Sequence, residues 1–213
     1  MRGPEIDAQA VLCCHANDLR GSSHADESSG SVRAAPAIPR WRKCTIRLRS
    51  GAVYSHKPDD YLCPFCALAA GHPDPRGINR AHDVVRRDEL ATAFVSPRWW
   101  PRNHGHVLVI PNAHHENIYE LPARYGHAVH DLVQQLAVAI RQTYGCDGTS
   151  VRQHNEPAGN QDVWHYHVHV FPRYAGDDLY LTRPQEDLAP AEERRFHADR
   201  LRDHFRSAGT PGR

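Results

Sequence analysis

The stretch HYHVHVFPR, residues 165–173, places three histidines two positions apart. Valine, tyrosine and phenylalanine favour extended chain, so the stretch predicts a β-strand. Alternate side chains of a strand share a face, and His165, His167 and His169 should therefore point the same way. The residues between them should pack beneath the sheet: Tyr166, Val168 and Val170.

Several interpretations compete for this row of imidazoles. The chain holds 17 His in 213 residues, so the spacing can also arise by chance on an exposed strand. A three-histidine zinc site with an open water position is one alternative. Three such positions span about 13 Å, however, and one straight strand hardly converges all three rings on one metal. The other alternative uses the rings separately. A neutral imidazole then attacks phosphorus near pH 7, because its pKa lies close to neutrality, while flanking groups hold the oxygens.

A second pattern is the Cys-x-x-Cys spacing of Cys63 and Cys66. No secretory signal is recognisable, which predicts a cytoplasmic, reducing setting in which disulfides are not expected. In that setting the pair is interpreted as metal ligands or as a redox pair.

Charge and hydropathy exclude two classes of partner. Lys and Arg number 26 against 25 Asp and Glu, a formal net charge of +1. No basic excess is available to neutralise phosphates, so nucleic-acid binding is not expected as the main role. No window of about 18 apolar residues occurs, so no membrane span is expected.

The composition divides the chain into three parts. Residues 1–55 are rich in Ser, Gly, Ala and Pro without any period, which predicts a disordered N-terminal extension. One hypothesis is that translation begins near Val53 and that the upstream stretch is an artefact of gene calling. Residues 56–180 are expected to form the catalytic domain, and residues 181–213 a C-terminal helix and tail.

Hydrophobic periodicity predicts the elements of the folded part. A cysteine knuckle should lead into a short helix that stops at Gly71, and a longer helix should cover 122–144 with Gly145 as its cap. The expected strands cover 82–88, 89–97, 105–112, 148–156 and 165–173. Their hairpin-like grouping predicts an α+β fold with an antiparallel sheet of about five strands, one long helix and one or two shorter helices.

Both of the longer predicted helices have a periodic apolar side. The buried side of the helix at 122–144 is expected to consist of Val129, Leu132, Val133, Leu136 and Ile140. A charged helix is predicted over 187–207, and its buried side is expected to consist of Leu188, Phe196, Leu201 and Phe205.

Four motifs in order resemble the histidine triad (HIT) family, in its bacterial zinc-bearing type. HYHVHVF (165–171) is similar to the family's His-φ-His-φ-His-φ-φ signature, and NEPAGNQDVW (155–164) to the approach that precedes it. GHVLVIP (105–111) with NAHHENIYELP (112–122) resembles the strand and segment before the family's long helix, and CPFC (63–66) its N-terminal cysteine pair. The resemblance covers about residues 59–175. It implies a homodimeric α+β protein that binds purine nucleotides.

The resemblance also implies roles for individual residues. His167 would be the nucleophile that forms a nucleotidyl-histidine, with one ring nitrogen donating to a backbone carbonyl. His169 and Gln161 would hold phosphate oxygens, and a histidine at the third triad position is typical of hydrolases rather than of nucleotide transferases. The remaining substrate-binding positions would be His154, Asn155, His106 and Arg98. Arg98, or Ser96 with a short shift, stands where relatives grip the ribose hydroxyls.

The same resemblance completes a metal site. In zinc-bearing relatives the second ligand pair corresponds to His114 and His165, with the adjacent His115 as a competitor. Together with Cys63 and Cys66 these residues would form a closed, structural Cys2His2 zinc site. No organic cofactor is implied.

The predicted function is hydrolysis at the α-phosphate of nucleotide phosphoramidates, dinucleoside polyphosphates or adenylate adducts. Two alternatives stay open: a nucleotide-binding or interaction protein with little turnover, and a histidine-ligated metallohydrolase.

Overall fold

The computed structural model describes residues 55–208. The predicted disorder of residues 1–55 and the hypothesis of a start near Val53 therefore lie outside the described residues, apart from residue 55. Within the described part, no helix is both long enough and apolar enough to cross a membrane.

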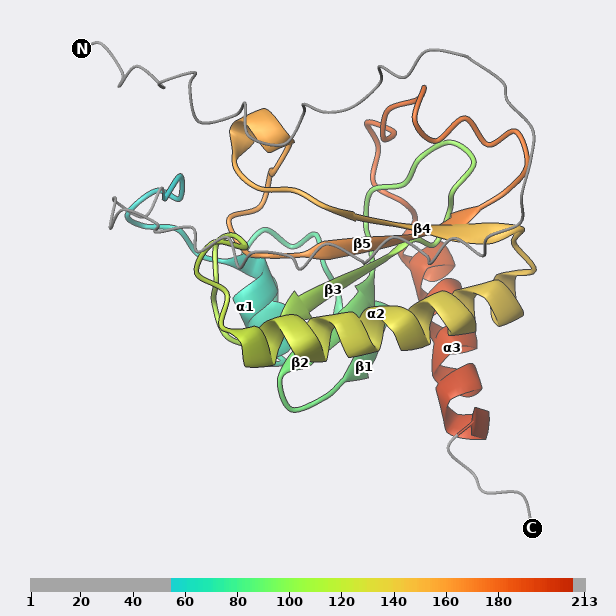
Figure 1. The fold of residues 1–213 in the computed structure, drawn as a ribbon, viewed down its shortest axis with the longest axis horizontal. Helices are drawn as coiled ribbons and strands as arrows, with labels where there is room; N and C mark the ends of the chain where they lie inside the picture. Colours follow the sequence, from blue (N-terminus) through green and yellow to red (C-terminus); the bar gives the residue numbers. More distant parts are fainter. Residues whose placement is uncertain (1–54, 209–213) are drawn as a thin grey trace, which may run out of the picture. The chain divides into compact units, whose positions relative to one another are not determined.

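Five antiparallel strands form one sheet, in the order β1-β2-β3-β5-β4 (Figure 1). The strands are β1 (Val84–Arg87), β2 (Ala91–Val95), β3 (Val107–Pro111), β4 (Gly148–Gln153) and β5 (Val168–Arg173). Because β5 inserts between β3 and β4, His169 lies inside the sheet and β4 forms an edge. The predicted α+β class with a five-stranded antiparallel sheet is confirmed.

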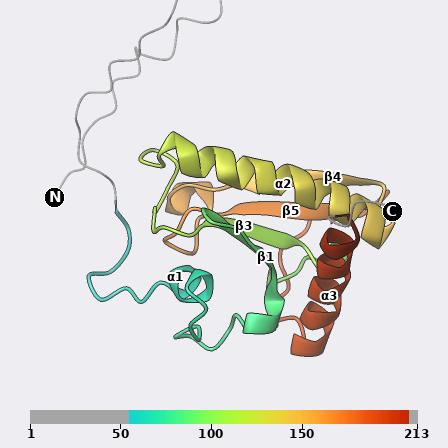
Figure 2. The same ribbon diagram turned by 90° about the horizontal axis from the view of Figure 1, so that it is seen from below.

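The helices cover both faces of this sheet. They are α1 (Pro64–Ala69), α2 (Ala123–Tyr144) and α3 (Ala191–Ala208), with short 3-10 turns η2 (Ala81–Asp83) and η3 (Pro157–Gly159). Figure 2 shows α2 lying along one side of the strands and α1 on the opposite side. The helix α2 ends at Gly145, whose φ of 67° is the left-handed conformation that favours glycine.

Two apolar clusters flank the sheet. All five predicted core positions of α2 are buried, and they pack with Tyr166, Val168 and Val170 as expected. The cluster on the other face joins α1 to β2 and β3, and it consists of Phe65, Leu68, Ala69, Phe94, Leu108, Ile110 and Val163. The triad histidines therefore lie on the α1 side of the sheet, opposite α2.

The triad strand is shorter than predicted. The strand β5 begins only at Val168, so His165 and His167 precede it. The reason is a local change of partner, because the amide of Tyr166 donates to the carbonyl of His115 (2.6 Å) instead of to a neighbouring strand. The predicted alternation of faces nevertheless persists through this segment.

The predicted buried side of the C-terminal helix is confirmed for Leu201 and Phe205 and wrong for Leu188 and Phe196. The helix α3 begins at Ala191, after Pro190, so Leu188 precedes it and is 42% exposed; Phe196 is 58% exposed. The buried residues are Arg194, Ala198 and Leu201, and Phe205 packs at the edge of the core. Arg194 takes an inward position because its Nη1 lies 2.5 Å from Oδ2 of the fully buried Asp83.

Candidate active site and metal centre

Two cysteines and two histidines converge where α1 meets the triad segment. Cys63 caps the N-terminus of α1, and Cys66 lies one turn further along the helix. The Sγ of Cys63 lies 3.3 Å from Nδ1 of His165, and the Sγ of Cys66 lies 3.3 Å from Nδ1 of His114. All four candidate ligand atoms lie within 4.8 Å of one another.

This cluster fits a tetrahedral zinc ion. Zinc–sulfur bonds of about 2.3 Å and zinc–nitrogen bonds of about 2.0 Å place the ligand atoms of such a site between about 3 and 4 Å apart. The ring of His165 is oriented for this role, because its Nε2 donates to the carbonyl of Pro111 (3.0 Å) and Nδ1 keeps its lone pair. The predicted competitor His115 is not in the cluster, and its ring instead packs against Tyr125.

His167 lies directly after the metal cluster in the chain. Its Nδ1 donates to the carbonyl of His165 (2.7 Å), which leaves Nε2 with the free lone pair. The side chain is 2% exposed, and this burial lowers the pKa of His167 below its usual value. The hydrogen bond to His165 and the charge of Asp162 oppose the shift. The ring is therefore neutral at pH 7 and has one unprotonated nitrogen.

His169 on β5 faces His106, which directly precedes β3. The Nδ1 of His169 lies 3.4 Å from Nε2 of His106, and the ring of Phe171 stacks on both histidines. Burial lowers the pKa of His106 to about 3 and holds the pKa of His169 well below its usual value. Both rings are neutral at pH 7, so they can act as hydrogen-bond donors without carrying charge.

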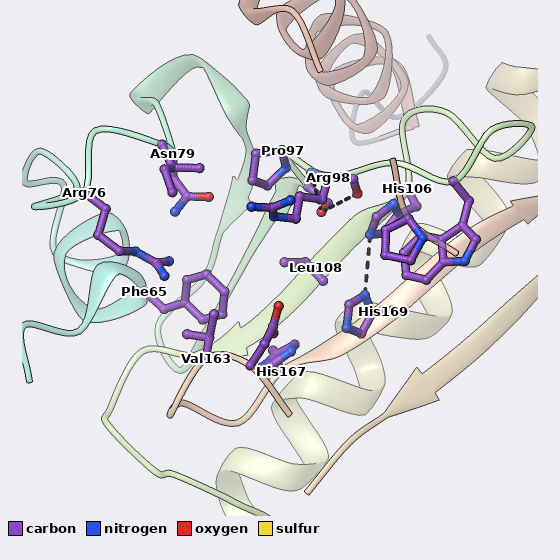
Figure 3. Close-up of a pocket in the computed structure, with 15 residues that line it drawn as sticks. Phe65, Arg76, Asn79, Pro97, Arg98, His106, Leu108, Val163, His167 and His169 are labelled. Carbon is purple, nitrogen blue, oxygen red and sulfur yellow. Dashed lines mark hydrogen bonds between the residues drawn. The ribbon is translucent and has the colours of Figure 1, made fainter. Parts of the chain in front are cut away.

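A cavity of about 320 Å³ opens in front of these histidines. Figure 3 shows His106 and His169 at one end, with Phe65 and Val163 toward the other. The apolar part of the lining consists of Phe65, Ile78, Pro97, Trp100, Leu108, Val163 and Pro184. The polar part consists of Arg76, Asn79, Ser96, Arg98, Asp162, His106, His167 and His169. An apolar compartment beside neutral imidazoles can accept a flat ring at one end and a phosphate at the other.

The predicted substrate-binding residues divide into two groups. His106 and Arg98 line the cavity, and Arg98 also donates from Nη1 to the carbonyl of Glu186 (3.1 Å). His154 lies beside the cavity, where its ring meets the edge of the His169 ring and its Nδ1 donates to Gly159 (2.6 Å). Ser96, the alternative to Arg98, is buried and also lines the cavity.

The structure does not bring Gln161 and Asn155 to the cavity wall. Both amide hydrogens of Gln161 are used, because its Nε2 donates to the carbonyls of Glu116 (2.6 Å) and Val163 (3.0 Å). The Oδ1 of Asn155 accepts from the amide of Ile118 (2.9 Å). These side chains fasten the loop before the triad to the segment after β3.

Other lining residues were not predicted from the sequence. Phe65 stands inside the Cys-x-x-Cys motif, and an apolar residue between two predicted ligands indicates a buried position beside them. Asn79 is 4% exposed; its Nδ2 donates to Asp74 (2.6 Å) and its Oδ1 has no partner among the described residues. Asp162 follows Gln161 directly. Nothing in the local sequence distinguishes Asn79 from an ordinary loop residue.

Comparison with known proteins agrees with this geometry. The HIT domain model matches residues 79–176. The protein named Protein hit of Bacillus subtilis is 36% identical over 121 residues, which are 54% of this chain and 74% of that protein. Adenylylsulfatase HINT3 of Arabidopsis thaliana is 32% identical over 82 residues, 38% of this chain and 42% of that protein. A zinc-bound histidine triad family protein from Mycobacterium smegmatis superimposes with a TM-score of 0.54 at 28% identity, covering 68% of this chain and 96% of that one. With His169 on a central strand, His165 and His167 directly before it, a cavity in front of the triad and relatives of this similarity, the chain belongs to the HIT family.

Proposed function

We propose that the protein is a nucleotide hydrolase that acts through a covalent nucleotidyl-His167 intermediate. Its substrates would be nucleotide phosphoramidates, dinucleoside polyphosphates or adenylate adducts. The hydrogen bond from His167 Nδ1 to the carbonyl of His165 carries this proposal, because it fixes a neutral tautomer whose Nε2 is free. The relative named adenylylsulfatase supports adenylate adducts as one substrate class.

The reaction would proceed in two displacements at phosphorus. In the first, Nε2 of His167 forms a bond to the α-phosphorus. The bond from this phosphorus to the leaving group breaks, and the leaving group keeps the electron pair. In the second, water attacks the phosphorus and gives up a proton to solvent, the electron pair of the N–P bond returns to Nε2, and His167 regains its neutral form. His169 and His106 would hold the phosphate oxygens, which aids both steps by stabilising charge that develops on them.

Gln161 would act as a positioning residue in this scheme. Its hydrogen bonds to the backbone hold the approach to the triad, and they leave no amide hydrogen for a phosphate. Asn155 would position the same loop, whereas His154, Arg98 and His106 are the candidates for direct substrate contact.

The four-ligand cluster supports a structural metal site rather than a catalytic one. Cys63, Cys66, His114 and His165 would fill all four positions of a tetrahedral zinc ion, so no position would remain for a water molecule. Such an ion would hold His165, whose carbonyl orients His167. The alternative of a histidine-ligated metallohydrolase is therefore less well supported. A homodimer and a cytoplasmic location stay predictions.

Replacing His167 by asparagine tests the proposal. Turnover of adenosine 5′-phosphoramidate and of diadenosine triphosphate should be lost, while zinc content and AMP affinity stay close to wild type. Rapid quenching of the wild-type reaction should yield an acid-labile adduct whose mass exceeds that of the protein by one AMP residue. Retained turnover in the variant, or AMP binding without turnover in the wild type, would contradict the proposal and favour the binding-protein alternative.

A further inference from the structure

One row of side chains crosses four strands on the cavity side of the sheet. Phe94 pairs with Leu108, Leu108 pairs with His169, and His169 pairs with Arg152. Directly opposed residues on neighbouring strands share a face, and adjacent strands lie about 4.8 Å apart. The row therefore changes from apolar through imidazole to cationic over about 15 Å, which is three strand spacings.

Arg152, at the cationic end, is held in an aromatic cage. Its Cζ lies 5.7 Å from the centre of the Trp100 ring, 5.0 Å from that of Phe171 and 4.6 Å from that of Tyr180. Trp100 also lines the cavity, so the cage adjoins the cavity on the side of His106 and His169. Rings on several sides restrict the rotamers of the guanidinium and lower the entropy lost when it binds a ligand.

The charge of Arg152 has no counter-ion in the described part of the chain. Its Nε and Nη2 are buried without a hydrogen-bond partner, and no carboxylate of residues 55–208 forms an ion pair with it. The neighbouring Arg173 differs, because it forms an ion pair with Asp177 at 2.7 Å. A half-buried, unpaired cation is costly, and a bound anion would offset that cost.

The location of Arg152 relates this anion to the proposed reaction. Leu108, in the apolar half of the row, lines the compartment that would hold the base. His167 would attack the α-phosphate, whose oxygens His169 and His106 would hold. A group attached to the α-phosphate on the far side from the base would then reach β4. Asp162 also lines the cavity, but its charge acts on His167 and it forms no ion pair with Arg152.

We propose that Arg152 binds the phosphate of the leaving group, so that the protein prefers nucleoside 5′-phosphoanhydrides to phosphoramidates. This inference rests on the proposed function. In the first displacement the bond from the α-phosphorus to the bridging oxygen breaks, and the oxygen keeps the electron pair. The leaving phosphate gains negative charge, which the guanidinium stabilises. In a phosphoramidate the nitrogen keeps the electron pair of the broken P–N bond and takes up a proton from solvent, so it leaves as a neutral amine and gains no such charge.

The experiment compares two substrates in Arg152→Met. The kcat/KM for diadenosine triphosphate should fall about 10- to 100-fold, as expected for loss of a charge-assisted hydrogen bond. The kcat/KM for adenosine 5′-phosphoramidate should change less than about threefold. Arg152→Lys should restore part of the anhydride activity. Arg124→Met is the matched control, because it removes a guanidinium that stacks on Tyr125 away from the cavity and should leave both activities unchanged.

A binding measurement makes the test independent of turnover. In a His167→Asn background, ADP should bind more tightly than AMP, and adding Arg152→Met should remove this preference without changing AMP affinity. An equal fall for both substrates, or an unchanged ratio of ADP to AMP affinity, would overturn the inference and leave Arg152 a packing role. Absence of turnover in the wild type would instead count against the proposed function, while the ADP and AMP comparison would still decide the role of Arg152.

Discussion

The Sγ of Cys63 lies 3.3 Å from Nδ1 of His165, although 102 residues separate them in the chain. The carbonyl of the same His165 accepts the hydrogen bond from His167 Nδ1. One residue therefore belongs both to the candidate metal centre and to the orientation of the candidate nucleophile. Loss of the metal should therefore change the orientation of His167 through His165.

Replacing His114 by alanine should remove bound zinc. The three remaining ligands cannot close a tetrahedral site, and unfolding should become easier because binding of a structural zinc contributes folding free energy. Zinc per chain, measured by atomic emission, and the thermal midpoint should both fall. His115→Ala is the control, since His115 is adjacent but not in the cluster, and it should retain zinc. Equal loss of zinc in both variants would argue against the assigned ligand set.

The rate of nucleotide hydrolysis should remain high at pH values below about 6.5, the usual pKa of histidine. Only the neutral ring of His167 can attack phosphorus, and burial lowers its pKa, so the neutral form persists to lower pH. The acid limb of kcat/KM should therefore lie below pH 6.5. The charge of Asp162 opposes the shift, so Asp162→Asn should move the limb to still lower pH. A limb at or above pH 6.5 in the wild type would refute this assignment.

Acid should destabilise the protein through His106. The pKa of this ring is about 3 in the folded protein and about 6.5 when unfolded, so below pH 6.5 the unfolded state binds more protons. The free energy of unfolding should therefore decrease as the pH is lowered below 6.5, and His106 should account for up to about 1.4 kcal/mol of this decrease per pH unit. His106→Phe keeps an aromatic ring but cannot ionise, and its urea-unfolding free energy should depend less on pH between 6 and 4. Equal slopes for both proteins would contradict the assignment.

Gly105 should tolerate no side chain. Its φ is +72°, and an added Cβ would collide with the ring of His197, which is itself held between Trp99 and Tyr144. Gly145 has a similar φ of +67° but nothing within 4 Å of an added Cβ. Gly145→Ala should cost about 1 kcal/mol from backbone conformation alone. Gly105→Ala should cost about 1–3 kcal/mol more, from the clash. Similar urea-unfolding free energies for the two variants would show that the ring of His197 moves aside at little cost in free energy.

Periodicity predicted the parts of the fold that depend on local packing. The alternation around the triad placed Tyr166, Val168 and Val170 on the α2 side, and the helical spacing identified the buried side of α2. For α3 the same reasoning was right about Leu201 and Phe205 but wrong about Leu188 and Phe196, because it assumed that all large apolar residues are buried. There the small Ala198 permits close packing, and a long-range ion pair with Asp83 draws Arg194 inside.

The candidate site depends on long-range contacts that spacing cannot reveal. The gap of 48 residues between Cys66 and His114 carries no signal of their contact, so the ligand set required a resemblance to known sequences. Gln161 was expected at the phosphate, but its amide group is used by the backbone. Arg152 was missed because its relation to His169 is a strand register, which only the folded sheet defines.

The match to the HIT model ends at residue 176, but the hydrophobic core includes residues beyond that point. Ala198 and Leu201 of α3 are fully buried against the sheet and α2, and Phe65, which lines the cavity, precedes the match. The segment recognised by similarity is thus shorter than the segment that folds. A fragment cut at the edges of the match would expose apolar surface at both ends and lose one wall of its own cavity. A truncated protein intended to fold should therefore include residues 55–208.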